Sequence, residues 1–68
     1  MLRAEHNGYE FVIEQDKPEV GVYMYVFIEG QCVRDELQND LGTCIRIALE
    51  DYGVPTVAWS EDGKSSIE

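Results

Sequence analysis

The chain has few of the side chains that build metal centres or cross-linked scaffolds. It contains one histidine and two cysteines among 68 residues, which is too few for a disulfide framework. His6 is far in sequence from both Cys32 and Cys44, so a structural zinc site is not expected. Because a chain of this size buries only roughly 60% of its unfolded surface, self-association remains as a further source of stability.

Long apolar segments are also missing. The longest apolar run, Val22 to Ile28, has seven residues, whereas a membrane helix needs about twenty. The sequence shows no charged-then-apolar leader and no Asn-x-Ser/Thr sequon. We therefore expect a soluble, cytoplasmic protein that does not act at a membrane.

Basic side chains are scarce as well. Five Lys and Arg stand against fourteen Asp and Glu, which gives a formal net charge of −9. Contacts to phosphate backbones need clustered bases, and here the bases are scattered, so direct binding to nucleic acid is not expected. An acidic surface keeps a small protein soluble, and it also suits a protein partner with a basic face, such as a nuclease or a toxin. Charge alone does not separate these two roles.

The clearest periodic pattern runs from Asp40 to Gly53. Its apolar residues are spaced as on one face of a helix: Leu41, Cys44, Ile45, Ala48, Leu49 and Tyr52. Asn39 or Asp40 can cap the first turn, and Gly53 suits the left-handed position after the last turn, before Pro55. The pattern predicts an amphipathic helix over about 40–52, which needs a sheet to lie on.

Two stretches before this helix predict an antiparallel β-hairpin. Residues 9–15 alternate between two faces, one with Tyr9, Phe11 and Ile13 and the other with Glu10, Val12 and Glu14. The segment Asp16-Lys17-Pro18-Glu19 has the composition of a turn, so a loop of about five residues is expected between the two strands.

The second strand of the hairpin, residues 22–28, is apolar on both faces, as in the interior of a sheet. An aliphatic row is expected to receive the helix: Val22, Met24, Val26 and Ile28. An aromatic row is expected on the opposite, open face: Tyr23, Tyr25 and Phe27.

The stretch between hairpin and helix has two interpretations. A helix beginning near Cys32 would enclose Gly42 at a cost of about 1 kcal/mol. We favour a tight turn at Glu29-Gly30 and a short third strand within 31–37, with Gly42 in the first turn of a helix that begins at residue 39 or 40.

After the helix, residues 54–59 predict a final strand, with Pro55 tolerated at its start. Residues 1–8 and 60–68 show no periodicity and are expected to be flexible termini. The sequence thus predicts a single α+β domain over 1–68. Its three- to four-stranded, mainly antiparallel sheet begins with the hairpin, carries one helix on one face and ends in a short strand.

Two strings in the second half of the chain, DELQNDL at 35–41 and ALEDYGVP at 48–55, resemble a pattern of small uncharacterised bacterial proteins. The resemblance implies no activity, ligand or catalytic residue.

Residues with catalytic or metal-binding chemistry form no recognisable site. His6 lies in a polar terminal segment, and Cys44 is on the apolar face of the predicted helix. The acidic neighbours of Cys32 disfavour a reactive thiolate. The nearest group of carboxylates is Asp35, Glu36 and Asp40. It lacks the alternating oxygen ligands and central glycine of a calcium loop. We therefore expect no catalytic residue, cofactor or metal.

The open sheet face remains as an interaction surface, formed by Tyr23, Tyr25, Phe27, Glu10 and Glu14, with Asp35 and Glu36 at its rim. Aromatic residues are enriched in interface cores. The leading hypothesis is a small, acidic, non-catalytic protein-binding module, including an inhibitor or immunity-type protein for a basic partner. The alternatives are a homodimeric structural protein that associates through this face and a minor enzyme that uses carboxylates.

Overall fold

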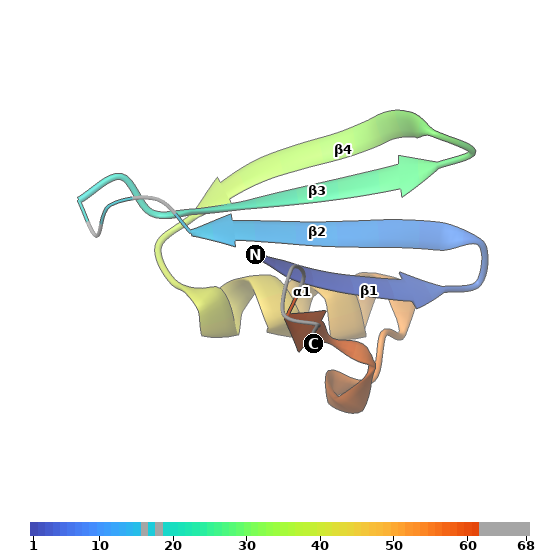
Figure 1. Cartoon of the computed structure of the whole chain (residues 1–68). Coiled ribbons are helices and arrows are strands. Elements are labelled where there is room, and N and C mark those ends of the chain that lie inside the picture. Colours follow the sequence, from blue (N-terminus) through green and yellow to red (C-terminus); the bar gives the residue numbers. More distant parts are fainter. Residues whose placement is uncertain (16, 18, 62–68) are drawn as a thin grey trace, which may run out of the picture.

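The computed structural model describes residues 1–15, 17 and 19–61 (Figure 1). Its elements, in chain order, are β1 (Leu2–His6), β2 (Tyr9–Gln15), β3 (Val22–Ile28), β4 (Gln31–Gln38), α1 (Leu41–Tyr52), the 3₁₀ helix η1 (Thr56–Ala58) and β5 (Ser60–Glu61). The strands form one sheet in the order β4-β3-β2-β1-β5, and every neighbouring pair is antiparallel. The predicted α+β class, with one helix packed on the sheet and a short strand last, is confirmed.

Two tight turns set the register of the meander. The β1–β2 turn has Asn7 at φ 53° and Gly8 at φ 83°, and the β3–β4 turn has Glu29 at φ 51° and Gly30 at φ 80°. Positive φ at both central residues is the type I′ pattern, whose twist matches that of antiparallel strands. The predicted turn at Glu29-Gly30 and the third strand after it are confirmed, which excludes a helix beginning near Cys32.

Helix α1 begins and ends where its capping residues are. The Oδ1 atom of Asp40 accepts hydrogen bonds from the backbone N–H and the hydroxyl of Thr43, at 2.8 and 2.9 Å. These bonds hold the pKa of the Asp40 carboxyl below its usual value. At the other end Gly53, at φ 75°, donates its N–H to the carbonyl of Leu49. The predicted helix bounds are confirmed.

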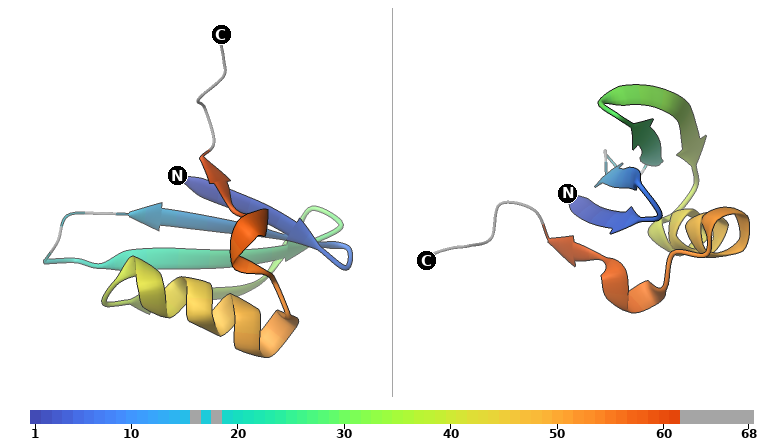
Figure 2. Two further views of the ribbon diagram at one scale, coloured as in Figure 1. Left: turned by 90° about the horizontal axis from the view of Figure 1, so that it is seen from below. Right: turned by 90° about the vertical axis from the view of Figure 1, so that its right-hand side faces the viewer.

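The core lies between α1 and one face of the sheet (Figure 2). Its buried side chains are Ala4, Phe11, Ile13, Val22, Met24, Val26, Cys44, Ala48 and Val54. Cys44 and Ala48 are small, so the middle of the helix can approach the sheet closely. The predicted apolar face of the helix is wrong at one residue. Leu49 is 47% exposed, whereas Ile47, which was not assigned to that face, packs against the core. The contact is centred on Cys44 and Ala48, which at 100° per residue turns Leu49 outward.

The expectation that residues 1–8 form a flexible terminus is wrong, because Leu2–His6 is strand β1, between β2 and β5. Only Ala4 is buried in it, and Arg3 and Glu5 alternate with the residues that face α1. Two apolar side chains, Leu2 and Ala4, in a strand of five residues give too short an alternation for a clear periodic signal.

The end of the chain also differs from the prediction. Val54 is fully buried, and the chain then turns through η1 instead of continuing as a strand over 54–59. Ala58 and Trp59 pack against the core, and β5 then pairs with β1 at the edge of the sheet (Figure 2). Residues 60 and 61, expected to be flexible, are therefore in a strand, and residues 62–68 lie outside the described part of the chain.

Candidate interaction surface on the open sheet face

The side of the sheet that points away from α1, which we call the open face, carries alternate residues of four strands. They are Arg3 and Glu5 of β1, Glu10, Val12 and Glu14 of β2, Tyr23, Tyr25 and Phe27 of β3, and Asp35 and Leu37 of β4. All five residues expected to form an interaction surface therefore lie on this one face, on two adjacent strands.

The three aromatic side chains of β3 form a continuous strip. The rings of Tyr23 and Tyr25 are nearly parallel, at 12°, with centroids 6.1 Å apart, and the centroids of Tyr25 and Phe27 are 6.5 Å apart. This spacing follows from the strand itself, since residues i and i+2 share a face about 6.6 Å apart. All three side chains are half-buried, so each retains surface to offer a partner.

Apolar neighbours widen the aromatic strip on both sides. Val12 lies opposite Tyr25 and is only 8% exposed, and Leu37 lies opposite Tyr23 and is 51% exposed. Leu37 was not expected here, because a period-two pattern does not say which side of an edge strand faces the core.

Carboxylates flank the strip. Glu14 lies opposite Tyr23, Glu10 opposite Phe27 and Asp35 opposite Tyr25. Burial, followed by the charges of Glu14 and Asp35 among others, raises the pKa of the Tyr25 hydroxyl. The open face thus carries the carboxylates of Glu5, Glu10, Glu14 and Asp35 together with one described base, Arg3.

Two shallow hollows lie between the side chains of this face. One, of about 290 Å³, is lined by Glu14, Gln15, Tyr23 and Tyr25. The other, of about 360 Å³, is lined by Met1, Arg3, Glu10, Val12, Glu14, Tyr25, Phe27 and Gly30. Among the described residues, the lining of the first includes a carboxylate and no base, whereas Arg3 lines the second.

A larger hollow, of about 580 Å³, lies at one end of the sheet between the two tight turns. Its lining includes His6 and three acids, Glu5, Glu10 and Glu29. Within the described residues, no three His, Cys, Asp or Glu side chains are placed to hold a metal ion.

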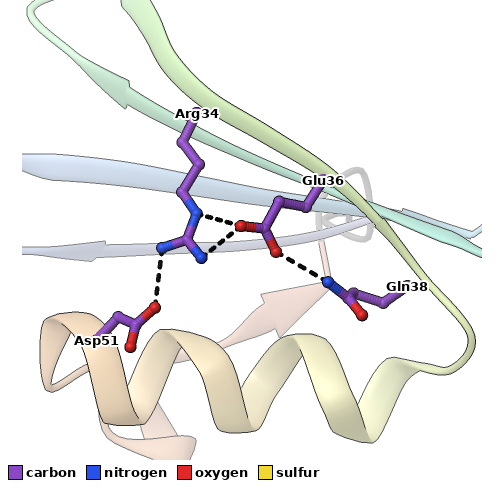
Figure 3. A network of polar contacts seen from close by, with 4 residues as sticks. All are labelled: Arg34, Glu36, Gln38 and Asp51. Atoms are coloured by element: carbon purple, nitrogen blue, oxygen red, sulfur yellow. Dashed lines mark hydrogen bonds and ion pairs between the residues drawn. The ribbon is translucent and has the colours of Figure 1, made fainter.

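The placement of Glu36 at the rim of this face is wrong. On β4 the row that faces α1 is polar, and Arg34 pairs there with Glu36 through its Nε and Nη2 atoms (Figure 3). Arg34 Nη1 also donates to Asp51 Oδ2 of α1 at 3.0 Å, and Gln38 Nε2 donates to Glu36 at 2.8 Å. Contacts with Tyr52, then Asp51 and Glu36, raise the pKa of Arg34. This network, which the sequence analysis missed, fixes β4 to the helix.

The two cysteines lie in different surroundings. Both are free thiols, with Cys44 buried and Cys32 exposed. Burial raises the pKa of the Cys44 thiol, and its Sγ lies 3.9 Å from the carbonyl of Val22, so it acts as a small core side chain. His6 lies on β1 and is half-buried, with Nε2 near Gly53 at the end of α1.

Comparison of the chain with protein-family models, with curated proteins and with solved structures returned no match. In the described part of the chain, no helix has both the length and the apolar character needed to cross a membrane. The features that mark the candidate surface are its geometry and its charge.

Proposed function

We propose that this chain is a non-catalytic protein-binding module of the cytoplasm that docks on a basic protein through its open face. An inhibitor or immunity-type protein is the most specific form of this function. The supporting observation is a strip of three aromatic rings flanked by carboxylates, on the sheet face opposite the only α-helix of the described residues.

The aromatic strip supplies the apolar part of such an interface. Tyrosine and phenylalanine bury a large area with few rotatable bonds, which is why aromatic residues are frequent among the most energetic interface positions. A standard interface takes about 800 Å² from each partner, and the chain exposes 4407 Å² in total. Such an interface would therefore cover about a fifth of the exposed surface.

The acidic charges orient a basic partner as it approaches and raise the rate of association. A net charge of −9 repels nucleic acid and attracts a basic protein over distances of about a Debye length, which is about 10 Å at 0.1 M ionic strength. Complementary charges mainly raise the association rate, while buried aromatic contacts slow dissociation.

The homodimer is less well supported by the same surface. If a second copy packed on the open face, Glu10, Glu14 and Asp35 would meet carboxylates of equal sign, and like charges brought together in an interface cost free energy. The carboxylate enzyme has less support still, because the hollows beside these acids are shallow and open, unlike an enclosed substrate site.

The experiment that tests the proposal is capture by immobilised protein with a matched pair of variants. Tyr25→Ala removes the central ring of the open face, and Leu49→Ala removes an exposed apolar side chain from α1. We expect basic proteins that bind the wild type and Leu49→Ala at low salt to be lost with Tyr25→Ala. A photo-crosslinking amino acid placed at Leu37, which is 51% exposed on the open face, is expected to label the same proteins.

Retention of the same proteins by both variants, or the absence of crosslinks from position 37, would overturn the proposal. A circular dichroism spectrum of Tyr25→Ala that matches the wild type is the control for folding.

A further inference from the structure

We propose that the hollow lined by Glu14, Gln15, Tyr23 and Tyr25 receives an arginine side chain of the basic partner. This inference rests on the proposed function and specifies the chemical group that its surface recognises. We call this site the arginine hollow.

The walls of the arginine hollow suit a flat cation. The rings of Tyr23 and Tyr25 are within 12° of parallel, so a planar group that stacks on one ring is also aligned with the other. A guanidinium group is planar, weakly hydrated and attracted to the faces of aromatic rings. An ammonium group is compact and strongly hydrated, so it gains less from the same walls.

The carboxylate of Glu14 supplies the counter-charge. Glu14 is exposed and lies opposite Tyr23. Within the described residues it forms no ion pair. An ionised carboxylate can accept two parallel N–H bonds from one guanidinium, an arrangement that lysine cannot make. Asp35, opposite Tyr25 on the other side of β3, adds negative charge without lining the hollow.

The neighbouring hollow is a poorer site for a cation. It is lined by Glu10 and Glu14, but also by Arg3, whose charge opposes that of an incoming base. Its two rings, Tyr25 and Phe27, are tilted by 39°, whereas Tyr23 and Tyr25 of the arginine hollow are within 12° of parallel. The nearly parallel rings therefore favour the Glu14 end of the open face for a planar cation.

Two synthetic peptides of equal length and charge test the inference. Each is acetylated and amidated, with three basic residues separated by glycines; one carries arginine and the other lysine. Titration into isotopically labelled protein is followed by nuclear magnetic resonance of the tyrosine rings. Stacking of an exposed cation is worth about 0.5–1 kcal/mol, so we expect the arginine peptide to bind about two- to fivefold more tightly. Its largest shifts are expected at the rings of Tyr23 and Tyr25.

Matched variants identify the groups responsible. Glu14→Gln and Tyr23→Leu are expected to abolish the preference for arginine, while Tyr23→Phe, which keeps the ring, is expected to retain it. Glu50→Gln removes the same charge from the exposed side of α1 and is expected to leave the preference unchanged. Circular dichroism of each variant shows whether the fold is kept.

Equal affinity for the two peptides, or shifts confined to the Glu5 and Glu10 end of the face, would overturn the arginine hollow while leaving the protein-binding function standing. If neither peptide shifts any residue of the open face and Tyr25→Ala still captures the same proteins, both proposals fail.

Discussion

Glu5 of β1 and Glu10 of β2 are direct cross-strand partners on the open face. Like charges in this position destabilise a sheet, and opposite charges stabilise it, by about 0.2–1 kcal/mol. Under the proposed function, a basic partner placed over the pair would relieve the repulsion.

The first prediction follows from this pair. Glu5→Lys is expected to raise the urea midpoint of unfolding, because it converts a repulsive pair into an attractive one, and to slow association with a basic partner. Urea denaturation and stopped-flow binding measure the two effects. A urea midpoint that is unchanged or lower would contradict a repulsion between these two side chains in the folded state.

The second prediction contrasts two apolar side chains. Met24 is fully buried and Leu49 is 47% exposed. Met24→Ala is expected to cost about 2–5 kcal/mol, a large share of the about 5–15 kcal/mol available to a small domain. Leu49→Ala is expected to change the free energy of unfolding by less than about 0.5 kcal/mol. Equal effects in denaturant titrations would mean that α1 is rotated from the orientation described.

The third prediction concerns pH and the cap of α1. Because the folded-state pKa of Asp40 lies below the ordinary value of 3.8 for this side chain, its contribution to stability is complete above that ordinary value. The contribution is lost as the pH falls through the lower, folded-state pKa. Asp40→Asn keeps a capping oxygen that does not titrate. We expect the wild type to lose stability relative to Asp40→Asn as the pH falls below about 4, measured by thermal unfolding in parallel. If the melting temperatures of the two proteins change equally with pH down to acid conditions, the proposed capping role of the Asp40 carboxylate is wrong.

The fourth prediction concerns the link between β4 and α1. Asp51→Asn is expected to cost less than about 1 kcal/mol, because its ion pair with Arg34 is half exposed. Arg34→Gln is expected to cost more, since it removes both ion pairs and leaves Glu36 unpaired beside the core. A double-mutant cycle by urea denaturation gives the coupling between Arg34 and Asp51. A coupling of zero would mean that the pair adds nothing to the fold.

The fifth prediction concerns the oligomeric state. The carboxylates of the open face should keep two copies apart, so a monomer is expected by equilibrium sedimentation at micromolar concentration and low salt. Tyr25→Ala serves as the comparison. A wild-type dimer that becomes a monomer in Tyr25→Ala would favour the homodimeric alternative over a foreign partner.

Much of the candidate surface could be predicted from the sequence, because the alternation of side chains between the two faces of a strand is a local property. Residues i and i+2 share a face whatever surrounds the strand, so the aromatic row of β3 and the acidic row of β2 could be written down in advance. That the two rows lie side by side followed from the hairpin connection, which pairs Glu14 with Tyr23. Leu37 and Asp35 joined them only through the register of β4.

By itself, the sequence determined the features whose causes are local. Asp40 and Gly53 bound α1 because each satisfies backbone groups within a few residues of itself, and Glu29-Gly30 forms its turn because hairpin geometry requires positive φ there.

Tertiary structure decided the features that depend on distant contacts. Strand β1 exists because β2 and β5 pair with it, although its own side chains bury little. Leu49 lies outside the core because the helix packs on the sheet through the side that carries Cys44 and Ala48, whose small side chains allow a close approach. The apolar Leu37 faces outward because Arg34 and Glu36 find partners on the side of α1. Periodicity fixes which residues share a face, but only packing against the rest of the chain fixes which face is buried.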